Sequence, residues 1–95
     1  MLFAMLLKER AGTAKERIAR RAEWKYPEGM RRVAEYWLFA SPPDPTVISI
    51  VESESIAPIM ATLSEWDDVF HITVVPVVTA EEGLKLAAQM KQGSH

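Results

Sequence analysis

The chain contains no cysteine, only four glycines and no hydrophobic run long enough to cross a membrane. Without cysteine, a disulfide framework, a thiol nucleophile and cysteine-ligated zinc or iron–sulfur centres are excluded. The glycines stand apart at positions 12, 29, 83 and 93, which excludes a glycine-rich phosphate loop. No serine lies in a nucleophile-elbow pattern, so a hydrolase triad has no support. We expect no bound cofactor and no dedicated metal site.

Positive charge is concentrated in the first third of the chain. Residues 1–32 hold nine of the eleven Lys and Arg and four of the thirteen Asp and Glu, a net charge of +5 against −7 for the remainder. The total of −2 is slightly acidic, whereas nucleic-acid-binding domains have a basic balance or a continuous basic stripe. We therefore expect neither a nucleic acid nor a membrane as partner. The helical stripe formed by Arg17, Arg21 and Lys25 is interpreted as a solvated outer face.

The 95 residues, 48% of them hydrophobic, predict a single globular domain over residues 1–92. Residues 93–95, Gly-Ser-His, are typical of a purification-tag remnant, which leaves His71 as the native histidine. The lack of cysteine fits a reducing compartment, so we expect a cytoplasmic location. A chain this short buries only about two-thirds of its unfolded surface, and pairing with a second copy would bury more. We therefore expect self-association.

Hydrophobic patterning predicts seven elements. Strands are expected near residues 2–8, 33–40, 47–51 and 69–78, and helices near 13–25, 55–66 and 79–92. This order is that of an α+β, ferredoxin-like βαββαβ fold with an extra C-terminal helix and an antiparallel four-stranded sheet in the order 4-1-3-2. It places the wholly apolar first strand in the centre and the strand that contains Pro76 at an edge.

Two helices can cover only one face of such a sheet. Apolar sets such as Phe70, Ile72, Val74 and Ile48, Ile50 are expected to face the helices. The uncovered face would then carry mixed side chains: His71, Thr73, Ser49, Glu35 and Trp37. We expect a second subunit to pack over this face and to enclose a small, mostly apolar or aromatic molecule. The predicted ligand-binding residues are Trp37, His71, Thr73 and Ser49.

Five short motifs follow one another along the chain: Pro27-Glu28-Gly29, Val51–Glu54, Trp66-Asp67-Asp68, Phe70–Val78 and Glu81-Glu82. In this order and spacing they resemble the family called domain of unknown function 3303, over residues 1–86. That family is similar to dimeric α/β-barrel proteins, in which two ferredoxin-like subunits join their sheets, so the resemblance implies a homodimer. The wider superfamily includes cofactor-independent monooxygenases, haem-degrading enzymes, isomerases and ligand-sensing modules, and the fold alone does not choose among them. His71 departs from the family pattern, so any role it has would belong to this protein.

Three functional hypotheses follow. The leading one is a homodimer that binds or senses a small, mostly apolar molecule in its barrel. An alternative is a cofactor-independent monooxygenase or isomerase that uses the same cavity, with His71 or Glu35 removing a proton from the substrate. A third is a protein–protein interaction module that recruits a partner through its edge strands and basic helix.

Several polar residues have a simpler interpretation that we favour over a catalytic one. For His71, a hydrogen-bonded position on an edge strand is favoured over a role as general base or haem ligand. Asp67 and Asp68 are interpreted as solvated groups at a helix end rather than as cation ligands. Glu52 is expected to pair with an arginine, either Arg31 or Arg32.

Overall fold

A computed structural model describes residues 1–39, 42 and 44–93. Its elements are, in order, β1 (Leu2–Glu9), α1 (Ala14–Glu23), β2 (Met30–Trp37), β3 (Val47–Ser53), α2 (Ala57–Trp66), β4 (Phe70–Val77) and α3 (Ala80–Gly93). The predicted order of elements is confirmed. Residues 94–95 of the predicted tag remnant, and residues 40, 41 and 43 between β2 and β3, lie outside the described residues.

The four strands form one antiparallel sheet in the order β2-β3-β1-β4, which confirms the predicted ferredoxin-like arrangement. The apolar run of β1, residues 2–7, pairs with β3 on one side and β4 on the other, as expected of a central strand whose side chains are apolar on both faces. Pro76 lies on the edge strand β4. One side of this strand has no neighbouring strand, so a residue without a backbone N–H is tolerated there.

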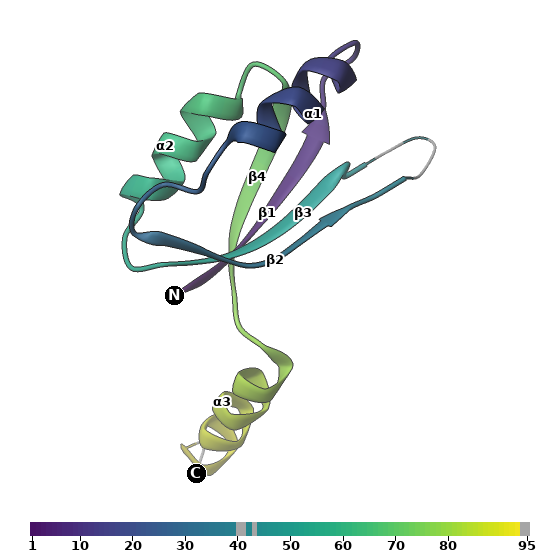
Figure 1. Cartoon of the computed structure of the whole chain (residues 1–95). Helices are drawn as coiled ribbons and strands as arrows, with labels where there is room; N and C mark the ends of the chain where they lie inside the picture. Colours follow the sequence, from purple (N-terminus) through teal and green to yellow (C-terminus); the bar gives the residue numbers. More distant parts are fainter. Residues whose placement is uncertain (40–41, 43, 94–95) are drawn as a thin grey trace.

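The helices α1 and α2 lie together on one face of the sheet, whereas α3 extends beyond the end of β4 and away from the sheet (Figure 1). The core forms between α2 and the sheet face that it covers, the inner face. Its buried apolar side chains come from all four strands and from α2 with the turn that follows: Met5, Leu7, Met30, Val51, Ile59, Trp66, Val69 and Phe70. The outer face of the sheet is not covered by the described helices (Figure 1).

The register of β3 corrects the predicted assignment of side chains to faces. Met5 on β1 lies opposite Ser49 on β3 and Val74 on β4, so these three share the inner face. Ile48 and Ile50 therefore point to the outer face, although their apolar character predicted the reverse. The prediction for Phe70, Ile72 and Val74 is confirmed. On β2, Glu35 pairs with Ser49 and Trp37 with Val47, so both belong to the inner face rather than to the outer one.

Helix α1 packs on the rest of the protein through its arginines, so the prediction of a solvated basic face is wrong for Arg17 and Arg21, whereas Lys25 is exposed. Arg17 is only 8% exposed, whereas Ile18 beside it is 56% exposed. The guanidinium carbon of Arg17 lies 5.2 Å from the centre of the Phe70 ring, and that of Arg20 lies 5.2 Å from the Trp66 ring. Guanidinium groups stack favourably on aromatic rings, and this stacking replaces the apolar contacts that a helix normally makes.

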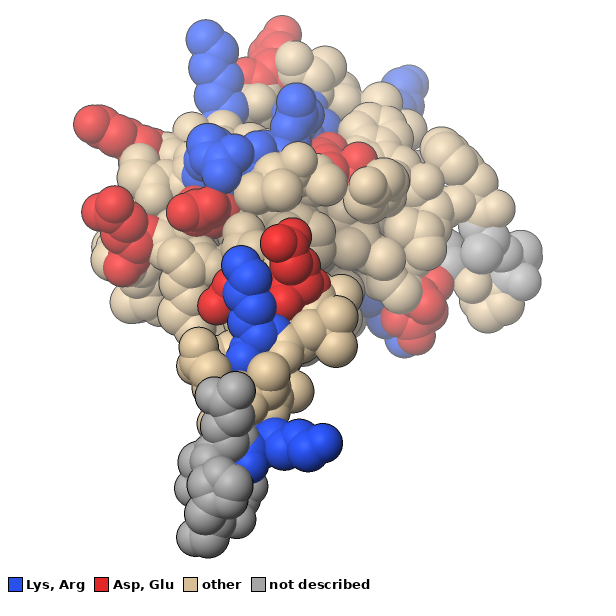
Figure 2. All heavy atoms as spheres, turned by 90° about the horizontal axis from the view of Figure 1, so that it is seen from below, with Lys and Arg blue, Asp and Glu red and all other residues tan. Residues whose placement is uncertain are grey.

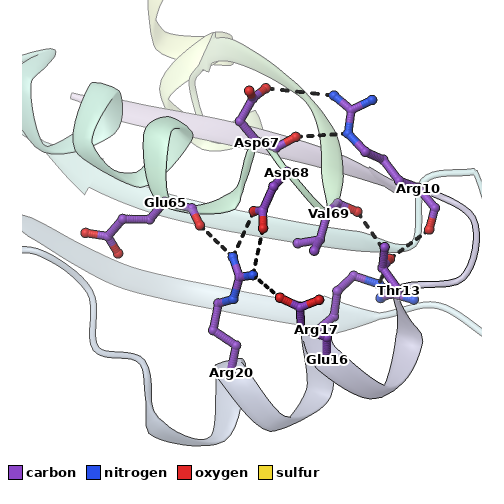
Figure 3. A network of polar contacts seen from close by, with 9 residues as sticks. All are labelled: Arg10, Thr13, Glu16, Arg17, Arg20, Glu65, Asp67, Asp68 and Val69. Carbon is purple, nitrogen blue, oxygen red and sulfur yellow. Dashed lines mark hydrogen bonds and ion pairs between the residues drawn. The ribbon is translucent and has the colours of Figure 1, made fainter.

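A polar network ties α1 to the turn between α2 and β4 (Figure 3). Arg20 donates two hydrogen bonds to the carboxylate of Asp68, at 2.9 and 2.8 Å, and one to the backbone oxygen of Glu65, at 2.7 Å. Hydrogen bonds from Arg20 lower the pKa of Asp68. Arg10 binds the backbone oxygen of Asp67 at 2.9 Å. The side chains of both aspartates are solvent-exposed, as the sequence predicted, but each also forms an ion pair with an arginine, Asp67 with Arg10 and Asp68 with Arg20.

Charged side chains of both signs are intermixed on the face seen in Figure 2, and they form no continuous basic surface there. The pairing of Glu52 with Arg31, at 2.9 Å, confirms one of the two partners proposed for that carboxylate. None of the helices in the described part of the chain is both long and apolar enough to cross a bilayer.

Candidate ligand-binding cavity

A cavity of about 300 Å³ lies between α1 and the inner face of β1, β3 and β2. All three tryptophans of the chain line it, together with three other aromatic residues: Trp24, Trp37, Trp66, Tyr26, Phe39 and Phe70. The side chains that α1 presents to this cavity include two long arginines, Arg17 and Arg21. Its volume is at the lower end of the range for small-molecule sites.

One wall of the cavity carries a compact polar cluster centred on Glu35. Its carboxylate accepts hydrogen bonds from Arg21 Nε (3.1 Å) and Nη2 (3.0 Å), from the Tyr26 hydroxyl (2.6 Å) and from Trp37 Nε1 (2.7 Å). The Tyr26 hydroxyl also lies 2.9 Å from Ser49 Oγ. Five residues from α1, the following loop, β2 and β3 thereby fix one another, which is expected of a polar group at the edge of an apolar site.

The cluster sets the protonation states of its members. Burial raises the pKa of Glu35, but the hydrogen bonds from Arg21, Tyr26 and Trp37 outweigh burial and hold it below the ordinary value. Burial, together with the hydrogen bond to Glu35, raises the pKa of Tyr26 to about 12. At neutral pH the site therefore contains a carboxylate and a protonated phenol.

A second ion pair lies on the other side of the cavity. Arg17 donates to Glu9 and, at 2.9 Å from its Nε, to the hydroxyl of Thr13. Each arginine that lines the cavity thus has a carboxylate partner, Arg17 with Glu9 and Arg21 with Glu35. Across residues 1–39, 42 and 44–93, no three His, Asp or Glu side chains come together as metal ligands would.

The predicted site residues separate into two groups. Trp37, Ser49 and Glu35 all line the cavity on the inner face. His71 and Thr73 lie on the outer face, opposite Lys8 and Leu6 of β1, and do not reach it. The expected single site formed by Trp37, His71, Thr73 and Ser49 is therefore wrong as one cluster, because the outer-face residues are separated from the others by the sheet itself.

His71 is an exposed, hydrogen-bonded residue on the edge strand β4, the interpretation that the sequence favoured. Its Nε2 lies 3.0 Å from Arg10 Nη1. A guanidinium can only donate, so the imidazole nitrogen is the acceptor in this contact. The imidazole thus acts here as an acceptor for an arginine that also binds the α2–β4 turn.

Sequence reasoning missed Arg21, Tyr26 and Trp66 as cavity residues. Arg21 was assigned to a solvated stripe, whereas its guanidinium carbon lies 5.5 Å from the Tyr26 ring centre and 5.8 Å from that of Trp24. The available signal was the pair of aromatic residues directly after a basic helix. This pair, Trp24 and Tyr26, indicates that the helix end folds over the core, and both rings do pack against it. The pair does not indicate which arginine folds with them.

Comparison with known proteins gives one match. A search of curated proteins found none, and neither did a search of solved structures. A single family model, described as "Domain of unknown function (DUF3303)", matches residues 1–91. The motifs on which the resemblance was based fall within this range. With nearly its whole length matched and the ferredoxin-like fold in place, the chain belongs to the DUF3303 family.

Proposed function

We propose that this protein is a binding or sensing module for a small, mostly apolar molecule, held in the cavity between α1 and the sheet. The observation that carries the proposal is the cavity itself, about 300 Å³ with aromatic walls and one polar wall. Ligand sites are typically concave and apolar, with a few convergent polar groups that set orientation. The Glu35 cluster supplies such groups, and the aromatic rings supply the apolar surface.

The enzymatic alternative has less support, because neither of its two candidate bases suits proton abstraction in this cavity. Glu35 already accepts four hydrogen bonds, and its lowered pKa makes it a weaker base than an ordinary glutamate. His71 lies on the opposite face of the sheet. A monooxygenase or isomerase would need a different base.

The proposal includes a homodimer in the cytoplasm, formed through the outer face of the sheet. That face carries half-buried and exposed apolar side chains from three strands: Leu2, Leu6, Ile48, Ile50 and Val75. A sheet face of this kind is unfavourable in water and is a suitable surface for a second copy. A module that recruits a different protein through the same face is the competing interpretation.

Binding can be measured with N-phenyl-1-naphthylamine, an uncharged fluorescent probe. All three tryptophans line the cavity, so a bound probe should accept their excitation energy. We expect saturable binding that is weakened about fivefold by Trp37→Ala, which removes an aromatic wall worth about 1 kcal/mol. The matched control is Tyr36→Ala, an exposed aromatic next in sequence but on the outer face. Equal binding by both variants would place the probe elsewhere.

A further inference from the structure

The hydrogen-bond donors and acceptors of the polar wall leave one atom with capacity to spare. Tyr26 has one hydroxyl proton, and the ionised Glu35 can only accept, so this proton goes to Glu35. Ser49 must then be the donor in its 2.9 Å contact with Tyr26. Its Oγ keeps unused lone pairs, and it lines the cavity while Ser49 is only 5% exposed. A buried oxygen in this state favours a ligand that donates a hydrogen bond to it.

The charges around the cavity are balanced before any ligand enters. Arg17 pairs with Glu9, and Arg21 pairs with Glu35, so the wall has two positive and two negative groups. The remaining guanidinium nitrogen of Arg21 donates to the Trp24 backbone oxygen at 3.3 Å. A charged ligand would lose its hydration here without meeting an unpaired opposite charge, which is costly in an apolar site. The cavity therefore disfavours carboxylates and protonated amines.

The aromatic residues of the cavity form a connected wall. Trp24 contacts Tyr26, with ring centres 4.7 Å apart, and Trp66, at 5.7 Å, and Trp66 in turn contacts Phe70 at 5.8 Å. Rings that are held by one another present fixed faces and edges. Such a surface favours flat aromatic ligands over flexible aliphatic chains, because a ring can stack on it or meet it edge to face without losing rotational freedom.

We propose that the cavity selects uncharged aromatic molecules that carry a hydroxyl group, such as phenols and naphthols. The aromatic body would lie on the ring wall, and the hydroxyl would donate a hydrogen bond to Ser49 Oγ. This inference rests on the proposed binding function and adds the ligand class to it. In this site Glu35 is not a base, and its carboxylate orients Tyr26 and, through Tyr26, Ser49. The chemistry of recognition is thus a serine acceptor inside an apolar, charge-balanced site.

Three naphthalene probes that differ in one substituent test the proposal by calorimetry at pH 7. We expect 2-naphthol to bind about five- to tenfold more tightly than 2-methoxynaphthalene, which cannot donate, because one net hydrogen bond is worth about 1 kcal/mol. The anionic 2-naphthoate should bind at least about tenfold more weakly than 2-naphthol. In Ser49→Ala the advantage of 2-naphthol over 2-methoxynaphthalene should fall to about twofold or less.

Tyr26→Phe provides a second test that does not alter Ser49. Without the phenol oxygen, the Ser49 proton is released and can be donated to a ligand oxygen, so 2-methoxynaphthalene should gain relative to 2-naphthol. An unchanged preference in both variants would overturn the role of Ser49. Equal affinity for all three probes would overturn the ligand class while leaving the binding function intact. Failure of all three probes and of N-phenyl-1-naphthylamine would overturn both.

Discussion

At the scale of single residues, Glu35 accepts four hydrogen bonds, and its ionisation should affect the stability of the whole chain. Hydrogen bonds hold its folded-state pKa below the ordinary value despite burial. A lowered pKa contributes stability above the unfolded-state pKa, and this contribution is lost as the pH falls through the folded-state pKa. Glu35→Gln should therefore lower the free energy of unfolding by about 2 kcal/mol at pH 7 and by much less at pH 3.

Denaturant unfolding at the two pH values measures this difference. The control is Glu82→Gln on α3, whose side chain is exposed and takes part in none of the contacts of the cavity. Asp68 also has a lowered pKa and contributes in the same direction in both proteins, so only the difference between wild type and variant is informative. An equally large loss at pH 7 and pH 3 would show that folding does not lower the pKa of Glu35.

Tyr26 offers a test at the opposite end of the pH scale. Burial and the hydrogen bond to Glu35 raise its pKa to about 12. A raised folded-state pKa stabilises the protonated phenol, and the contribution is lost as the pH rises from about 10 through 12. A titration followed at 295 nm should show a step near pH 12 that Tyr26→Phe removes. If Tyr26→Phe removed a step near pH 10 and none near pH 12, the buried hydrogen bond of Tyr26 would be contradicted.

The sequence predicted Trp37, Ser49 and Glu35 as candidate site residues, but for a face on which they do not lie. Side chains alternate along a strand, so an error of one residue exchanges the two faces. Ser49 was assigned to the outer face because serine is more polar than Ile48 and Ile50. It is buried instead because the oxygen of Tyr26, a residue distant in sequence, accepts a hydrogen bond from its hydroxyl. A pattern of single residues contains no information about such a distant partner.

At the scale of elements, α1 shows how an arginine-rich helix can pack on a small core. Arg17 is buried, binds Thr13 and Glu9, and stacks on Phe70. Arg17→Ala should lower the free energy of unfolding by about 2 kcal/mol, because both its charge-assisted hydrogen bonds and its ring contact are lost. The exposed Lys15 on the same helix provides the control, since Lys15→Ala should change it by less than about 0.5 kcal/mol.

Arg17→Lys separates the two contributions in the same denaturation experiment. Lysine keeps the charge but lacks the planar fork that reaches Thr13 and Glu9 together, so its stability should fall between wild type and Arg17→Ala. A lysine variant as stable as wild type would assign the effect to charge alone. Hydropathy could not predict this packing, because it treats arginine as a surface residue and isoleucine as a core residue, whereas Ile18 is 56% exposed.

At the scale of the molecule, local signals were sufficient for the order of elements and the order of strands. Turn residues separated the segments, and the apolar run at residues 2–7 of β1 and the proline in β4 indicated the centre and the edge of the sheet. Helix α3 was also predicted, but not its position away from the sheet (Figure 1). Leu84 on α3 is 72% exposed, and an isolated helix of this length is marginal in water. Both features favour an additional packing partner for the chain.

The proposed homodimer can be tested at Val75, which is 37% exposed on the outer face of β4. A stable interface buries about 800 Å² per partner, and a carboxylate placed among its apolar side chains would have no opposite charge. Val75→Glu should therefore convert a dimer to a monomer in sedimentation experiments. If the second copy is the packing partner of α3, the variant should also accelerate amide exchange in α3 more than in β1. The matched control is Ile56→Glu, which alters an exposed apolar residue at the start of α2, in the helical layer. If wild type sediments as a monomer, or if both variants dissociate equally, the outer face is not the dimer interface.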